Sequence, residues 1–434
     1  MVADPETSCP CYAENAPILN HTLSQVDEFG LPFDWMNEDG KVILLEKAVR
    51  TIPYGFLGVL FSVYLSQLGL DALLIGVVLA LTVASSAAYT LVASIFADRL
   101  GRKRTLIFFA LTDALAGAFL FSSDSLWAPI VAGIVGNMTV GAGEVGPFLT
   151  LEQAILPGTS DTRRRTLGFS VYNLIGYVAS SAGALLVGLP QYIGSGIAGY
   201  RPLFLAYLAS GLLGAYLYSR LSKRVEQEKT ASPSISVLSE ASKPIVRRLS
   251  ALFALDSFGG GFIGISILSY YFYARYSLQL GSLGLLFAGT QIVTAISFLA
   301  AERIARRIGL LKTMVYTHIP SNLLLAAIPF VASAPIAVGL LLSRQSLSQM
   351  DVPTRQSYLM SVVPEADRTA AAGFTNVSRS VAQTFSPSLA GYAIAALWLG
   401  SPFVIAGGLK VAYDLSLYKI FHRVKPPKES NITD

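Results

Sequence analysis

The sequence has 434 residues, of which 53% are hydrophobic and only 14% charged, and its mean hydropathy is +0.55. Water-soluble globular proteins of this length carry more charge, so the composition excludes that class and predicts a membrane protein. The net charge of +5 does not indicate a nucleic-acid partner, because the Lys and Arg residues lie in short loops between apolar stretches, where they determine topology.

The first 40 residues are predicted to form a soluble cytoplasmic tail. They contain scattered acids and no apolar run, unlike a secretory signal peptide. Cys9 and Cys11 flank a proline in this tail but have no companion ligands, and they leave no disulfide framework for the rest of the chain. We therefore expect no metal site and no cofactor.

Twelve apolar stretches follow, each suited to a hydrocarbon core that needs roughly 20 residues per helix. In the first, which begins near Lys41, Glu46 and Arg50 are spaced i, i+4 and are expected to pair on one helical face. The predicted spans are residues 51–70, 72–97, 105–121, 126–151, 167–189, 203–218, 251–273, 283–301, 313–331, 334–359, 370–397 and 403–420.

The longest polar connector, residues 219–249, divides the spans into two sets of six. The predicted units are a bundle over residues 41–218, the cytoplasmic linker, a second bundle over residues 250–422 and a cytoplasmic tail at 423–434. The fold class is an all-α membrane protein, with twelve transmembrane helices in two pseudo-symmetric six-helix bundles.

A charged turn after the second span puts one carboxylate beside four cations. It reads Asp98-Arg99-Leu100-Gly101-Arg102-Lys103-Arg104. A weaker copy follows the eighth span, about 204 residues later, and reads Glu302-Arg303-Ile304-Ala305-Arg306-Arg307. Glu152-Gln153 and Arg355-Gln356 repeat at nearly the same offset, so the two halves are related.

The distribution of cations predicts the orientation in the membrane. The loops after even-numbered spans hold most of the Lys and Arg residues, whereas the loops on the other side hold only Arg201 and Arg275. Both termini are therefore predicted to be cytoplasmic, in a multi-pass protein of the cell membrane.

Twelve spans in a six-plus-six arrangement, a long central loop and the repeated charged turn resemble the major facilitator superfamily. The resemblance implies a transporter in which two bundles rock about a central site. It also implies that the charged turns act as a cytoplasmic latch, formed by Asp98, Arg99, Gly101, Arg102, Lys103, Glu302, Arg303 and Arg306. Asp98 would face the start of span 11 near Ala370 and Ala372, and Glu302 the start of span 5, where helix dipoles favour negative charge.

Polar residues inside a membrane are costly, so they are the candidate functional residues. In the resembled family, spans 1, 4, 7 and 10 line the cavity and spans 2, 5, 8 and 11 join the bundles. On that basis we expect substrate binding or proton coupling from Arg50, Glu144, Asp256, Arg344, Asp351 and Arg379. Glu144 or Asp256 would carry the proton, or would pair with an Arg to hold the bundles together.

Other intramembrane residues have simpler interpretations. Glu152 and Arg355, with Asp351, are expected to form a cytoplasmic gate network. Asp113 on a peripheral span is expected to make a structural hydrogen bond or ion pair. Lys410 and Asp414 are spaced i, i+4 and should pair locally, and the lone His318 is expected to be a packing residue.

The sequence therefore predicts a secondary transporter, and no P-loop or catalytic motif indicates an enzyme. The favoured activity is proton-coupled export of small amphipathic organic compounds by a monomer. The alternatives are an uptake symporter for an organic anion, indicated by Arg50, Arg344 and Arg379, and a non-transporting receptor or scaffold with the same fold.

Overall fold

The computed structural model describes residues 35–139, 146–160, 165–194, 196–226, 238–364 and 367–423. All regular elements within these ranges are helices. The first half contains α1 (Glu38–Gln67), α2 (Ala72–Leu100), α3 (Arg102–Ser122), α4 (Trp127–Val135), α5 (Pro147–Ile155), η1 (Leu156–Gly158), α6 (Arg165–Leu186), α7 (Pro190–Ile193), η3 (Gly196–Tyr200), α8 (Arg201–Ser219) and η4 (Lys223–Val225). The second half contains α9 (Lys243–Gly261), α10 (Ile265–Tyr276), α11 (Leu280–Ile308), α12 (Leu310–Ala327), η5 (Ile328–Phe330), α13 (Ala334–Ser348), α14 (Asp351–Val362), α15 (Arg368–Ala396) and α16 (Ser401–Phe421).

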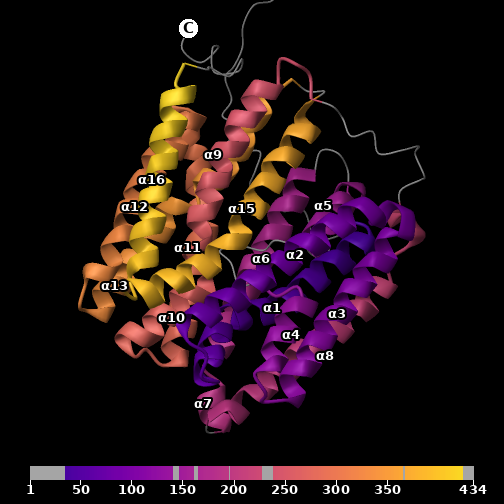
Figure 1. Cartoon of the computed structure of the whole chain (residues 1–434). Helices are drawn as coiled ribbons and strands as arrows, with labels where there is room; N and C mark the ends of the chain where they lie inside the picture. The colour runs from indigo at the N-terminus through magenta and orange to yellow at the C-terminus, as the bar shows by residue number, and fades with distance from the viewer. Residues whose placement is uncertain are drawn as a thin grey trace, which may run out of the picture.

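The helices form two six-span bundles, as the sequence predicts. Helices α1 to α8 pack mainly among themselves, as do α9 to α16, and Figure 1 shows the indigo-to-magenta and orange-to-yellow halves side by side. Three spans consist of two helices in series: α4 with α5, α9 with α10, and α13 with α14. Within the described residues, seven helical segments are long and apolar enough by themselves to cross a membrane.

The broken spans differ from the continuous ones that the sequence predicts, and glycine or proline explains each break. Helix α4 ends at Gly136, and α5 restarts at Pro147, which suits a first helical turn. Helix α9 ends in a run of glycines at Gly261, and α10 begins at Ile265. Pro353 lies in the first turn of α14 and lacks the N–H that a continuous helix would use.

The start of α1 and the connector after α8 lie on the same face, hereafter the terminal face. Asp39 in the first turn of α1 accepts hydrogen bonds from the backbone N–H and the hydroxyl of Ser222 at 2.7 and 2.6 Å. Asn37 caps the same helix by accepting a bond from the N–H of Gly40 at 2.9 Å. Helix α1 therefore begins a few residues before the predicted span, and it is anchored to the connector.

The two bundles join at the opposite face through α1 and α10. The hydroxyls of Ser266 and Ser269 donate to the carbonyls of Gly58 and Val59 at 2.8 and 2.7 Å, and Ser62 donates back to the carbonyl of Ser266 at 2.6 Å. All three serines are fully buried. Reciprocal bonds of this kind satisfy polar groups between helices and close this side of the molecule.

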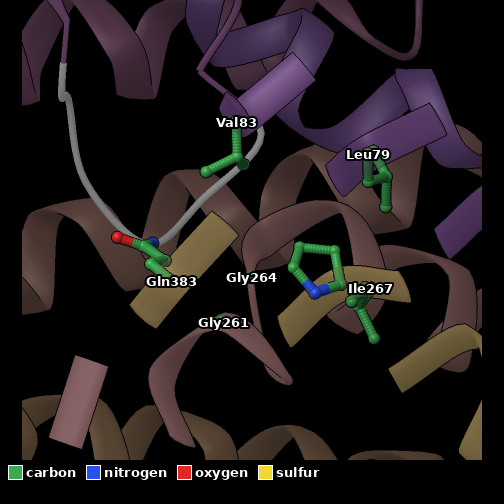
Figure 2. Close-up of a pocket in the computed structure, with 7 residues that line it drawn as sticks. Leu79, Val83, Gly261, Gly264, Ile267 and Gln383 are labelled. Carbon is green, nitrogen blue, oxygen red and sulfur yellow. The ribbon is translucent and has the colours of Figure 1, made fainter. Parts of the chain in front are cut away.

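Small residues let α2 and α15 approach closely beside that contact. A Cβ atom on Gly76 would lie 2.5 Å from the carbonyl oxygen of Pro387, and one on Gly391 would lie 2.4 Å from that of Ala72. Between α2, α15 and the α9–α10 break there remains a cavity of about 10 Å³ (Figure 2), room for about one water molecule. The bundles are therefore closely packed from this level to the opposite face.

Candidate functional site

A large cavity separates the two bundles on the side of the terminal face. Its volume is about 1210 Å³, and residues from both bundles line it, from Lys47 and Asn173 in the first half to Asn376 in the second. Val83 and Gln383 line both this cavity and the small one of Figure 2. The large cavity thus ends where the bundles meet. Toward the terminal face its lining extends to Gln153 on α5, whose end lies beside the start of α1, and the two halves diverge on that side (Figure 1).

Asp256 on α9 is the centre of a buried ionic cluster on the cavity wall. Its carboxylate lies 2.6 Å from Nζ of Lys410 and 3.2 Å from Nη1 of Arg355. Arg355 also contacts Asp351, one turn earlier on α14, at 2.7 Å. Each of these side chains is at most 8% exposed. Burial makes such a cluster costly unless every charge is matched, and here two carboxylates are shared between two cations.

His318 on α12 connects this cluster to a second carboxylate. Its Nδ1 lies 2.9 Å from Oδ1 of Asp414, and its Nε2 lies 3.9 Å from Oδ1 of Asp256. Asn322 donates to the other oxygen of Asp414 at 3.0 Å. The predicted local pairing of Lys410 with Asp414 is therefore wrong, because Lys410 bonds to Asp256 instead, at 2.6 Å.

Two arginines on the cavity have no carboxylate partner among the described residues. Arg344 on α13 donates through Nη1 to Oε1 of Gln345 at 2.8 Å, and its buried Nε has no hydrogen-bond partner. Gln345 is itself held by Oγ1 of Thr294 at 2.7 Å. Arg379 on α15 is half-buried and lines the same cavity. Neither guanidinium is neutralised, so the cavity has positive charge available to a ligand.

Arg50, by contrast, lies in a saturated cluster inside the first bundle. Its guanidinium bonds to Glu152 at 2.6 Å and to Glu46 at 3.2 Å, which confirms the predicted i, i+4 pairing. The hydroxyl of Tyr218 donates to both carboxylates at 2.6 and 2.8 Å, and that of Tyr172 donates to Glu152 at 2.6 Å. These contacts make the network a stabilising element of the first bundle, and the substrate or proton role predicted for Arg50 stays a prediction.

Asp113 on α3 makes structural hydrogen bonds. Its carboxylate accepts bonds from the hydroxyls of Tyr54 and Tyr207 at 2.8 and 3.0 Å, and from the backbone N–H of Asn137 at 2.8 Å. Asn137 follows the C-cap residue Gly136 and lies outside the helical hydrogen-bond pattern of α4. Asp113 therefore stabilises the break in the fourth span.

The remaining predicted site residues are placed as follows. Glu144 lies outside the described residues. Glu152 is buried among the first bundle's side chains and makes no contact with Arg355, so the gate network stays a prediction. Sequence reasoning missed Lys47, which lines the cavity and donates to the hydroxyl of Tyr172 at 3.0 Å. The sequence signal for Lys47 is its spacing of three residues from Arg50, which puts both side chains on neighbouring positions of one helix.

The structure aligns the two charged turns differently from the repeat that the sequence suggests. Gly101 and Gly309 occupy equivalent turns, between α2 and α3 and between α11 and α12, with φ of 96° and 88°. Glycine adopts such angles without strain. Asp98 lies three residues before its glycine and Glu302 lies seven before its own, so Glu302 is one helical turn further into the membrane than the repeat suggested.

At these loops, the carboxylates that accept hydrogen bonds in the described structure are not those of the latch prediction. Glu226 after η4 accepts bonds from the backbone N–H groups of Arg102 and Lys103 at 2.6 and 3.3 Å. Asp367, directly before α15, accepts hydrogen bonds from Ser239. The hydrogen bonds from Ser239 and Ser242 hold the pKa of the Asp367 carboxyl below its ordinary value. The side chains of Asp98 and Glu302 lie outside the described part of the structure, so the latch stays a prediction.

Comparisons with known proteins agree with this architecture. The family model of the Major Facilitator Superfamily matches residues 48–382. The chain is 24% identical over 431 residues to the uncharacterized membrane protein YJR124C of Saccharomyces cerevisiae, covering 91% of this chain and 96% of that one. Among solved structures, it resembles the nucleoside transporter NupG (TM-score 0.68, 14% identity, 90% of this chain and 100% of that one). It also resembles the human organic anion transporter MFSD10 (TM-score 0.62, 15% identity, 87% and 98%). At these identities, the likeness to solved structures establishes the fold.

Proposed function

This chain belongs to the Major Facilitator Superfamily, and we propose that it carries a small organic anion across a membrane by alternating access. The observation behind this proposal is the positive cavity, in which Arg344 and Arg379 contact no carboxylate among the described residues. A buried cation without a counter-charge is unfavourable, and an anionic substrate would supply that charge.

The charges along the cavity wall support the same conclusion. The described lining includes five cations and only two carboxylates: Lys47, Arg344, Arg355, Arg379, Lys410, Asp256 and Asp351. Both carboxylates are already bonded to cations. A cationic amphipathic compound would find no unpaired acid among them, whereas an anion would meet an excess of three positive charges.

Proton-coupled export of amphipathic compounds remains the second candidate function. It requires a cavity acid that can take up a proton and release it during transport. Glu144 is outside the described residues, and Asp256 is engaged by Lys410 and Arg355, so the geometry favours the anion. A receptor or scaffold has no need of a cavity of about 1210 Å³ between two transporter-like bundles.

We also propose the orientation that the cations predict. The terminal face would be cytoplasmic, since the exposed Arg99 and Arg220 lie there while Arg201 lies on the other side. The present conformation would then be open to the cytoplasm. Labelling of a tail cysteine such as Cys9 from outside intact cells would contradict this orientation.

A binding assay with matched neutral compounds tests the proposal. Purified protein is heated with benzoate, succinate or glucose 6-phosphate, and separately with benzamide, succinamide or glucose. Ligand at 100 times its Kd stabilises the folded state by about 2.7 kcal/mol. We expect at least one acid to raise the Tm, with its neutral counterpart inactive. Equal effects of acids and neutral counterparts, or no effect of any acid, would contradict an anion site.

Variants localise the site. Arg344→Gln and Arg379→Gln should each weaken binding of the active acid about tenfold or more, a change of about 1.4 kcal/mol. Arg275→Gln is the matched control, because Arg275 is exposed at the end of α10 and does not line the cavity. An equal loss in all three variants would indicate a non-specific charge effect.

A further inference from the structure

His318 lies between two carboxylates of different surroundings, and neither the fold nor the proposed anion site accounts for it. It is 2% exposed, it lines the large cavity and its ring stands edge-on to Tyr413 with centroids 6.0 Å apart. Its two nitrogens face Asp414 and Asp256. A histidine that only packed would not need an acid at each end of its ring.

We propose that His318 is the proton-binding site that couples proton entry to anion binding, so that one proton travels with the anion. This inference rests on the proposed anion transport and adds the coupling ion and its residue. The role differs from the one expected for Glu144 or Asp256, because the proton is held by an imidazole on α12, the ninth span, which is not among the spans that the resemblance assigns to the cavity.

The geometry gives His318 one hydrogen bond, to Asp414, and one longer contact whose sign depends on its charge. With Nδ1–H donating to Asp414 at 2.9 Å, the neutral ring presents the lone pair of Nε2 toward Oδ1 of Asp256 at 3.9 Å. A proton on Nε2 converts this unfavourable approach into an attraction between an imidazolium and a carboxylate. Asp256 would then interact with three cations, so its bonds to Lys410 and Arg355 would weaken.

The positive charge of Lys410, no longer fully matched by Asp256, links proton binding to anion binding. Asp256 is bonded to Lys410 at 2.6 Å and to Arg355 at 3.2 Å, and all three residues line the cavity with Arg344 and Arg379. When His318 becomes charged, the cavity gains one positive charge and Lys410 becomes available to a ligand. Reciprocity then requires that the anion also raise proton affinity at His318.

The charged groups around His318 come from α9, α13, α14 and α16. Helix α11 adds no charged side chain to the described cavity lining, and its Arg303 is exposed. The other elements contribute Asp414 and Lys410 from α16, Asp256 from α9, Arg355 and Asp351 from α14, and Arg344 from α13. Asp414 and Asp256 adjoin the ring directly, whereas the cations line the cavity in which the anion would bind.

Histidine NMR tests the site without a transport assay. The chain has three histidines, so a ¹⁵N-histidine-labelled sample gives three sets of signals, and His318→Gln assigns the buried one. We expect the His318 signals to report proton uptake as the pH is lowered, and bound benzoate, succinate or glucose 6-phosphate to increase the protonated fraction. A His318 signal that keeps one protonation state throughout, with and without these anions, would overturn the proposal.

Transport in liposomes tests the coupling. For the wild type, binding of the active acid should strengthen at least about fivefold between pH 8 and pH 6, and a proton gradient should drive its accumulation. His318→Gln should retain exchange of labelled for unlabelled anion but lose proton-driven accumulation, while the control His422→Gln, changed at an exposed histidine, keeps both. Intact proton-driven accumulation in His318→Gln would refute the inference.

The two proposals fail in different ways. If the wild type exchanges none of the three anions, anion transport is wrong even where His318 titrates. If exchange occurs, and a proton gradient drives the same accumulation in the wild type and in His318→Gln, only the coupling site is wrong. Should His318→Gln fail to fold, Asp414→Asn provides the second variant: loss of the Nδ1 partner should shift the His318 transition to lower pH, and an unchanged transition would contradict the arrangement.

Discussion

Adding one methyl group at Gly391 should shift the protein toward the conformation that opens at the opposite face. A Cβ there would lie 2.4 Å from the carbonyl oxygen of Ala72, 2.9 Å from Cα of Gly76 and 3.2 Å from its nitrogen. All three atoms belong to the backbone of α2, so no side chain can rotate away. Gly391→Ala therefore forces α15 and α2 apart in the present conformation, whereas the clash disappears once the two bundles separate there.

The size of the shift follows from the cost of overpacking. Inserting a methyl group into a closely packed contact costs about 1–3 kcal/mol. The alternative conformation is spared that cost, so its population relative to the present one should rise roughly 5- to 150-fold. The matched control is Gly408→Ala on α16, where a Cβ would meet nothing within 4 Å. Both changes raise helix propensity equally, so that effect cancels.

Cysteine labelling measures this population. Val187 is fully buried and lies 3.5 Å from the position of a Cβ on Gly284 in the other bundle. A Val187→Cys reporter, in a background with both tail cysteines changed to serine, should react with a maleimide only when the bundles separate. Its rate should rise at least about fivefold in Gly391→Ala and stay unchanged in Gly408→Ala. Equal rates in the two variants would refute the reasoning.

Three further changes test other parts of the structure. Asp98→Asn should favour the present conformation and slow the same labelling reaction, because the latch prediction gives Asp98 a role only in the state closed at the terminal face. Gly183→Ala should lower the Tm without changing labelling, since its Cβ would lie 1.9 Å from the carbonyl oxygen of Ile52 within one bundle. Glu226→Ala should also lower the Tm, by the equivalent of about 0.5–2 kcal/mol, because the N–H of Arg102 at the start of α3 loses its acceptor.

The sequence predicted the spans well because apolar length is set by the bilayer. It did not predict the breaks at Gly136 and Gly261, because glycine is common in transmembrane helices and most glycines there do not end a helix. The charged turn was recognised from its cations. The turn equivalent to it in the second half is identified by the positive φ angles at Gly101 and Gly309, and composition does not reveal these angles.

The pairing of buried charged side chains was predictable only where the contacts are local, although the predicted Asp256, Arg344, Asp351 and Arg379 all line the cavity. Glu46 and Arg50 pair at i, i+4 as expected. Lys410 and Asp414 have the same spacing, yet Lys410 bonds to Asp256, 154 residues away. Spacing shows which pairs are possible, and the packing of α16 against α9 and α12 decides between them. The acidic neighbours of His318 are likewise distant in sequence, so the sequence alone predicts only a packing role for it.

The two halves of the chain have the same architecture but use their buried arginines differently. Arg50 meets two carboxylates and is almost inaccessible, so its positive charge is already matched within the first bundle. Arg344 and Arg379 meet none among the described residues, and both line the cavity. An ion pair that is complete within one bundle survives every movement of that bundle, whereas a cation left open on the cavity wall gains its partner only when a ligand arrives. We therefore expect the first bundle to move as a rigid body. In the proposed anion transport, the charge that recognises the anion would come mainly from the second bundle, with Lys47 as the contribution from the first.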